Sequence, residues 1–327
     1  MSSKAACAKP ATVSGWRRNS VEAGTGNHLW ADRYDRDLAD IFAVQDEITQ
    51  AATIAVAPAI ADAEQQRAMR KPPGSLDAWG AYQRGLWHSG RYSVADNARA
   101  AKFFQQAIDF DPNFSGGYKG LAVVQTRAAF DFATDPPTIL SSIEALARRA
   151  VALDNADAEA SSILSNALRL RGDLTGALAE ARRALAISPN LAEAHGMLGV
   201  ALIFSGQPKE GLAFLETSFR LNPHARSASR MNGVTMGLYF SREYEAAIEA
   251  ATWAIRSNPD YAHPYRWLAA ALGQLGRIAE AKEALEKAIA VVPGSFDAYV
   301  RRRVPWHRPE DHAHMLEGLR KAGWRET

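Results

Sequence analysis

The sequence has a single cysteine, Cys7, which excludes a disulfide framework and a thiolate metal cluster. Its formal net charge is only +2, so the composition gives no strong field toward nucleic acid or a membrane surface. The longest apolar run, residues 51–61, is broken by Thr53 and Pro58 and is far shorter than the roughly 20 residues of a membrane-spanning helix. Residues 1–10 lack the apolar segment of a signal peptide. We therefore expect a soluble, cytoplasmic protein.

Motifs for catalysis and metal binding are also missing. The sequence has no Gly-rich phosphate loop, no GxSxG nucleophile elbow and no HExxH zinc motif. His312 and His314 point to different sides of a helix, whereas metal ligands on one helix need a spacing of three or four residues. We therefore expect no enzymatic activity and no cofactor.

A short basic run, Arg301 to Arg303, lies near the carboxyl end. Nucleic-acid binding requires a larger surface with aromatic platforms or a groove-reading helix, so we expect no nucleic-acid partner. We interpret the run as a solvated edge, and docking of an acidic partner segment is the alternative.

The main positive feature is an internal repeat of 34 residues. Residues 158–191 and 192–225 superimpose without a gap, and residues 262–295 follow the same frame. Each copy has a glycine between two helical segments and a proline after the second: Gly172 and Pro189, Gly206 and Pro223, and Gly276 and Pro293. The glycine suits a left-handed turn, and the proline stops the second helix.

Small residues recur at the eighth, twentieth and twenty-seventh places of each copy. They are Ser165, Ala177, Ala184, Gly199, Gly211, Ser218, Ala269, Ala281 and Ala288. Small side chains at these places let two antiparallel helices cross closely. The unit resembles the tetratricopeptide repeat, and the resemblance implies an all-α, right-handed superhelix, or α-solenoid. We expect six repeats over residues 75–295, with extra residues in the first, second and fifth copies, and capping helices over residues 296–327.

The amino-terminal part has a different pattern. Residues 1–20 carry no periodicity, and we expect them to be disordered. Residues 27–37 alternate as in a strand or hairpin, and a helix is predicted from about Asp40. The segment GNHLWADRYDRDLADIFAVQDEITQ, from Gly26 to Gln50, resembles the end of the TolB-amino-terminal-like domain. We therefore interpret residues 21–74 as a remnant of that domain with a linking helix.

The same domain precedes such repeats most often in bacterial class III adenylate/guanylate cyclase-like proteins. The resemblance therefore implies a non-catalytic protein–protein interaction scaffold, derived from a truncated regulatory region of a class III cyclase-like protein. One alternative is an adenylate or guanylate cyclase whose catalytic domain is missing from this chain. Another is the sensory half of a winged-helix transcriptional regulator, and a third is small-molecule binding in the groove.

The concave face of the superhelix is the expected binding site. The family lines this groove through places two, five, nine and twelve of its inner helices. Those places hold Glu159, Ser162, Asn166, Arg169, Glu193, Val200, Ile203, His263 and Arg266. An extended or helical peptide with apolar anchors flanked by charges would complement this mixture. The Lys/Asn/Arg clamp of chaperone-binding members is matched only at Asn166, so we expect a protein or peptide ligand other than a chaperone tail.

Overall fold

The computed structural model describes residues 14–21, 28–36, 61–70, 77–91, 93–130, 136–223, 228–301, 304 and 308–325. The chain divides into two compact units, residues 1–71 and residues 72–327. The first unit contains two strands and the helical residues 61–70. The second unit contains the helices that carry the candidate site.

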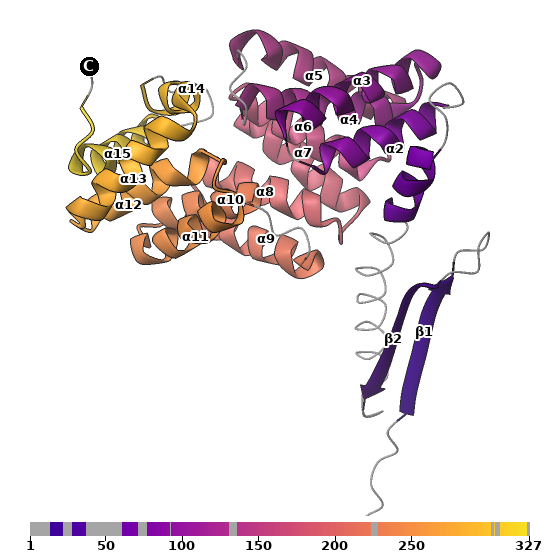
Figure 1. Ribbon diagram of the computed structural model, residues 1–327, viewed down its shortest axis with the longest axis horizontal. Helices are drawn as coiled ribbons and strands as arrows, with labels where there is room; N and C mark the ends of the chain where they lie inside the picture. Colours follow the sequence, from indigo (N-terminus) through magenta and orange to yellow (C-terminus); the bar gives the residue numbers. More distant parts are fainter. Residues whose placement is uncertain are drawn as a thin grey trace, which may run out of the picture. The chain divides into compact units, whose positions relative to one another are not determined.

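The strands of the first unit form an antiparallel hairpin, β1 (Ser14–Val21) and β2 (His28–Arg36) (Figure 1). β2 lies in the segment whose alternation predicted a strand. The expectation of disorder is wrong for residues 14–20, because β1 begins at Ser14. In the backbone register Trp16 pairs with Tyr34 and Arg18 with Asp32, so β1 is formed by pairing with β2, which its own sequence does not reveal. Residues 1–13, and the start of the helix predicted from Asp40, lie outside the described residues.

The second unit is built from helix pairs that stack one after another (Figure 1). The pairs are α2 (Ala78–Ser89) with α3 (Val94–Phe110), α4 (Ser115–Phe130) with α5 (Pro136–Leu153), α6 (Ala158–Leu170) with α7 (Leu174–Ile187), α8 (Ala192–Phe204) with α9 (Pro208–Leu221), α10 (Ala228–Phe240) with α11 (Tyr244–Ser257), and α12 (His263–Gln274) with α13 (Ile278–Val291). Each pair packs against the next, and the first helices of successive pairs also contact one another from α2 to α12. These first helices therefore form a continuous inner layer, and the predicted all-α solenoid is confirmed.

The helices of a pair cross closely at the small residues that the repeat predicted. The hydroxyl of Ser165 donates a hydrogen bond to the carbonyl oxygen of Ala177 at 2.7 Å, joining α6 to α7. A Cβ atom on Gly199 would lie 2.7 Å from the carbonyl oxygen of Gly211, and one on Gly211 would lie 2.5 Å from that of Gly199. Because neither position has room for a methyl group, α8 and α9 approach each other nearly backbone to backbone.

The turns inside the pairs use left-handed backbone at the predicted glycines. The angle φ is +85° at Gly172, +83° at Gly206 and +72° at Gly276. Glycine adopts this conformation without steric cost. The corresponding turn between α10 and α11 instead places Arg242 at a φ of 65°, which costs a residue with a Cβ atom about 1–2 kcal/mol.

The carboxyl end folds back onto the inner layer. A short helix α14 (Pro293–Phe296) and the π-helix η4 (Asp297–Arg301) precede α15 (Pro309–Lys321), which packs against α12. A Cβ atom on Gly318 of α15 would lie 2.5 Å from the carbonyl oxygen of Ala270. The hydroxyl of Tyr239 in α10 donates to the carbonyl oxygen of His314 at 2.9 Å. The inner layer is therefore covered by α15 at its carboxyl-terminal end.

Candidate functional site

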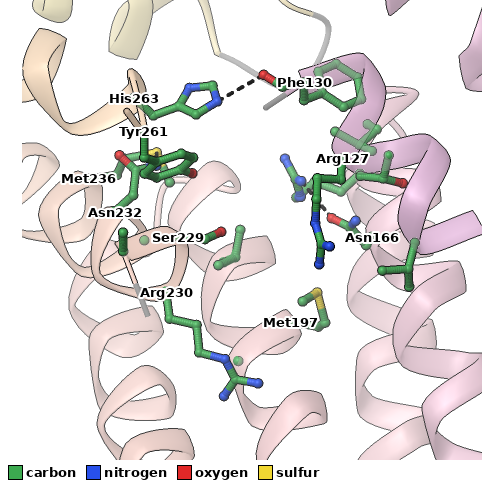
Figure 2. A pocket seen from close by; sticks show the side chains of 18 of the residues that line it. Arg127, Phe130, Asn166, Met197, Ser229, Arg230, Asn232, Met236, Tyr261 and His263 are labelled. Atoms are coloured by element: carbon green, nitrogen blue, oxygen red, sulfur yellow. Dashed lines mark hydrogen bonds between the residues drawn. The ribbon is translucent and has the colours of Figure 1, made fainter. Parts of the chain in front are cut away.

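The inner helices border a cavity of about 680 Å³. Most of its lining comes from α4, α6, α8, α10 and α12, and Tyr299 of η4 adds to it. Figure 2 shows the two sides of the cavity, with Arg127, Phe130 and Asn166 facing Asn232, Met236, Tyr261 and His263. The volume lies within the range of roughly 300–1,000 Å³ that ligand pockets occupy.

A hydrogen bond joins the two sides of the cavity, as the dashed line in Figure 2 marks. Nε2 of His263, at the start of α12, lies 3.1 Å from the carbonyl oxygen of Phe130, at the end of α4. Nδ1 of the same ring lies 2.7 Å from Nη1 of Arg266. Because a guanidinium can only donate, Nδ1 accepts, and the neutral ring carries its proton on Nε2 and donates it to Phe130. This contact links helices whose residues are 133 positions apart in the chain.

Six of the nine predicted groove residues line this cavity: Asn166, Arg169, Glu193, Val200, His263 and Arg266. They come from α6, α8 and α12, so the second, fifth, ninth and twelfth places of different copies do converge. The neighbouring Met197 and Phe204 of α8 complete an apolar wall with Val200.

The other three predicted groove residues do not line this cavity. Ile203 is fully buried. Its side chain packs beside Gly211 of α9 and Gly237 of α10, where a Cβ atom would collide with it. Ser162 is also fully buried, and its hydroxyl donates to the carbonyl oxygen of Ala158 at 2.9 Å. Glu159 is exposed and forms an ion pair with Lys119 at 2.8 Å, outside the cavity lining.

Positive charge dominates the cavity lining. Arg127, Arg169, Arg230 and Arg266 line it, and Glu193 is the one carboxylate among the described lining residues. Glu193 forms an ion pair with Arg230. The cavity thus favours a ligand with negative charge.

Two of these arginines are wholly or partly buried and lie against aromatic rings. The guanidinium of Arg266 lies 4.3 Å from the centre of the Tyr299 ring, and the side chain is only 3% exposed. Arg169 donates from Nη2 to Oδ1 of Asn166 at 2.7 Å and lies 5.2 Å from the Phe204 ring centre. Burial lowers the pKa of Arg169 and of Arg266 to about 10. Both stay charged near neutral pH.

Sequence reasoning missed the part of the site that comes from the fifth copy. Ser229, Asn232 and Met236 of α10 line the cavity. They occupy places two, five and nine if that copy begins at Ala228, where α10 starts, instead of at Arg226. The two extra residues of this copy therefore precede the helix. Starting the copy at the start of the helix would have identified Ser229, Asn232 and Met236. Tyr299 follows the last repeat, so no repeat frame could have identified it.

Two other classes of site find no support in the described part of the chain. No group of three or more His, Cys, Asp or Glu side chains there is arranged to hold a metal ion. None of the helices described combines the length and the apolar character that a membrane crossing requires.

Comparison with known families agrees with the helix pairs. Residues 168–229 match one family description of the tetratricopeptide repeat, and residues 141–192 and 237–298 match a second. These parts of the chain are tetratricopeptide repeats, as the 34-residue period predicted. Such repeats form protein-interaction scaffolds and are generally non-catalytic.

One curated relative links the chain to cyclases. The protein named "Putative adenylate cyclase 3" of Rhizobium meliloti (strain 1021) is 29% identical over 154 residues. The match covers 45% of this chain and 25% of the relative, so the chain spans only about a quarter of that protein's length. This similarity is consistent with the cyclase-like resemblance of the sequence.

Two solved structures of low sequence identity align with this chain. The crystal structure of the APC/C hetero-tetramer Cut9-Hcn1 aligns with a TM-score of 0.58 at 13% identity, covering 81% of this chain and 48% of that one. YrrB, described as a TPR protein with an unusual peptide-binding site, aligns at 20% identity and a TM-score of 0.38, covering 61% of this chain and 98% of that one. The first of these supports the solenoid architecture.

Proposed function

We propose that this protein is a non-catalytic interaction module that holds a segment of a partner protein on its inner face. The observation that carries the proposal is the convergence of six predicted groove residues, from three different helices, on one cavity. The repeat class adds weight, because such repeats serve as interaction scaffolds.

The lining also defines the partner segment that would fit. Met197 and Val200 are half-buried apolar side chains one helical turn apart on α8, so they can accept apolar anchors of a peptide. The arginines around them would attract acidic residues that flank those anchors. The partner is therefore a protein with an extended or helical segment of mixed apolar and acidic character.

The test is a pull-down from bacterial extract with the full chain and three variants. Met197→Asp/Val200→Asp places charges on the inner face. Ile278→Asp makes a similar change on α13, at a side chain that is 51% exposed. Arg301→Glu/Arg302→Glu/Arg303→Glu reverses the basic run near the carboxyl end. Circular dichroism verifies that each variant is folded.

We expect the inner-face variant to lose a specific partner that the wild type and the Ile278→Asp variant both retain. Loss of the partner by the basic-run variant, with retention by the folded inner-face variant, would move the binding site to the carboxyl-terminal edge and refute the proposal.

We also propose that the chain corresponds to the regulatory region of a class III cyclase-like protein. Two observations support this origin: the relative named as an adenylate cyclase, and the segment from Gly26 to Gln50. Translating the DNA upstream of Met1 in all frames tests it. A cyclase domain running into VEAGTGNHLW would support the proposal, and a winged-helix domain there would show a transcriptional regulator instead.

A further inference from the structure

Arg266 is a buried cation with unused hydrogen-bonding capacity. In the part of the chain that the structure describes, its hydrogen-bond acceptor is Nδ1 of His263, and Nε has no acceptor at all. No carboxylate of the described residues lies within ion-pair distance of Arg266. A guanidinium has five N–H donors, so this side chain, 3% exposed, keeps at least its Nε donor without an acceptor among the described residues. Such a group is costly to bury unless something binds to it.

Asn232 provides a second unsatisfied polar group on the same cavity. Its side chain is 8% exposed. Among the residues that the structure describes, Oδ1 has no hydrogen-bond partner and Nδ2 reaches only the sulfur of Met236, at 3.9 Å. Asn232 and Arg266 stand at the fifth places of α10 and α12, which are neighbouring inner helices in contact. One ligand can therefore meet both groups.

The shape of the cavity limits what that ligand can be. The hydrogen bond from His263 to Phe130 bounds the cavity between α12 and α4. The cavity volume of about 680 Å³ suits a compact molecule. The walls beside the two polar groups are apolar, formed by Met197, Val200 and Met236.

We propose that this cavity binds a small carboxylic acid that carries a hydroxyl or N–H group and an apolar body. The carboxylate accepts hydrogen bonds from Arg266. The hydroxyl or N–H group donates to Oδ1 of Asn232, and the apolar body packs against Met197, Val200 and Met236. The same chemistry could come from the acidic side chain of a peptide, and the peptide arm of the experiment below distinguishes the two sources.

The experiment measures thermal stabilisation of the full chain by a panel of compact acids. The acids are 3-phenyllactate, 3-phenylpropionate and 2-hydroxyisocaproate, each compared with its neutral amide at concentrations up to about 10 mM. A peptide arm uses the acetylated and amidated sequence Gly-Leu-Glu-Leu-Gly. No partner protein is present, so the outcome is independent of the pull-down proposed above.

We expect at least one acid to raise the melting temperature more than its amide does. Arg266→Met should weaken the binding of this acid by about 10- to 100-fold, because a charge-assisted hydrogen bond is lost. The matched control Arg256→Met, at an exposed arginine of α11, should leave the affinity for this acid unchanged. Asn232→Leu should remove the preference for 3-phenyllactate over 3-phenylpropionate, which lacks the hydroxyl.

The unliganded variant provides a second measurement. Replacing a buried charge by an apolar side chain is often neutral or stabilising, so unliganded Arg266→Met should melt at or above the wild-type temperature. A lower melting temperature for this variant would show that Arg266 has a structural role, and it would overturn the assignment. A response to none of the acids, an equal response to each amide, or a response to the peptide alone would also overturn it.

Discussion

The crossing of α8 and α9 gives the sharpest stability prediction. Gly199→Ala adds one methyl group, whose carbon would lie 2.7 Å from the carbonyl oxygen of Gly211, 3.0 Å from Cγ of Leu215 and 3.2 Å from its backbone nitrogen. Two of these three atoms belong to the backbone, so no side-chain rotation can relieve the overlap. Overpacking of this kind costs about 1–3 kcal/mol. The higher helix propensity of alanine offsets up to about 1 kcal/mol of this cost.

The net expectation is that Gly199→Ala lowers the free energy of unfolding by about 1–2 kcal/mol. Gly196→Ala, one turn earlier on the same helix, is the matched control. Its new carbon would meet only the hydroxyl of Ser218, at 3.4 Å, so the gain in helix propensity should raise stability by up to about 1 kcal/mol. Urea denaturation followed by circular dichroism measures both variants. A Gly199→Ala protein as stable as the Gly196→Ala protein would mean that the helix crossing has been assigned to the wrong register.

Three further predictions concern other elements. Arg242→Gly should raise stability by about 0.5–1 kcal/mol in thermal melts, since glycine relieves the left-handed strain at a small entropic cost, and a loss of stability would contradict the strain. Tyr239→Phe should cost about 1–2 kcal/mol and increase hydrogen exchange in α15, because the hydrogen bond from α10 to the carbonyl of His314 is lost; unchanged exchange would show that this bond does not hold α15. Burial lowers the pKa of His314 below its usual 6.5, so its contribution to stability is present above pH 6.5 and is lost as the pH falls below it. His314→Gln should therefore show a smaller loss of melting temperature on acidification than the wild type, and an equal loss would exclude this histidine as the cause.

The repeat architecture could be predicted from the sequence because its determinants are local. A turn glycine such as Gly172 and a crossing glycine such as Gly199 act within one helix pair, so a single copy contains the information. The inner-face places are local too, and they put Asn166 and Val200 on the cavity lining. The burial of Ile203 could not be predicted in this way, because its environment depends on two glycines of other helices, one of them in the next pair.

The closure of the cavity could not be predicted in this way. The contact between His263 and Phe130 depends on the curvature of the stack, which accumulates from small rotations between successive pairs. The sequence of one copy contains no information about this accumulated rotation. The return of the chain after α13, which brings Tyr299 to the cavity, also lies outside any repeat frame.

The central claim is that binding occurs on the inner layer of helices, and hydrogen exchange with and without the captured partner tests it most directly. The account predicts that the partner slows exchange in α6, α8 and α10, which line the cavity, and leaves α7, α9 and α11 nearly unchanged. Protection confined to those outer helices, or to α15 and the basic run before it, would contradict the claim.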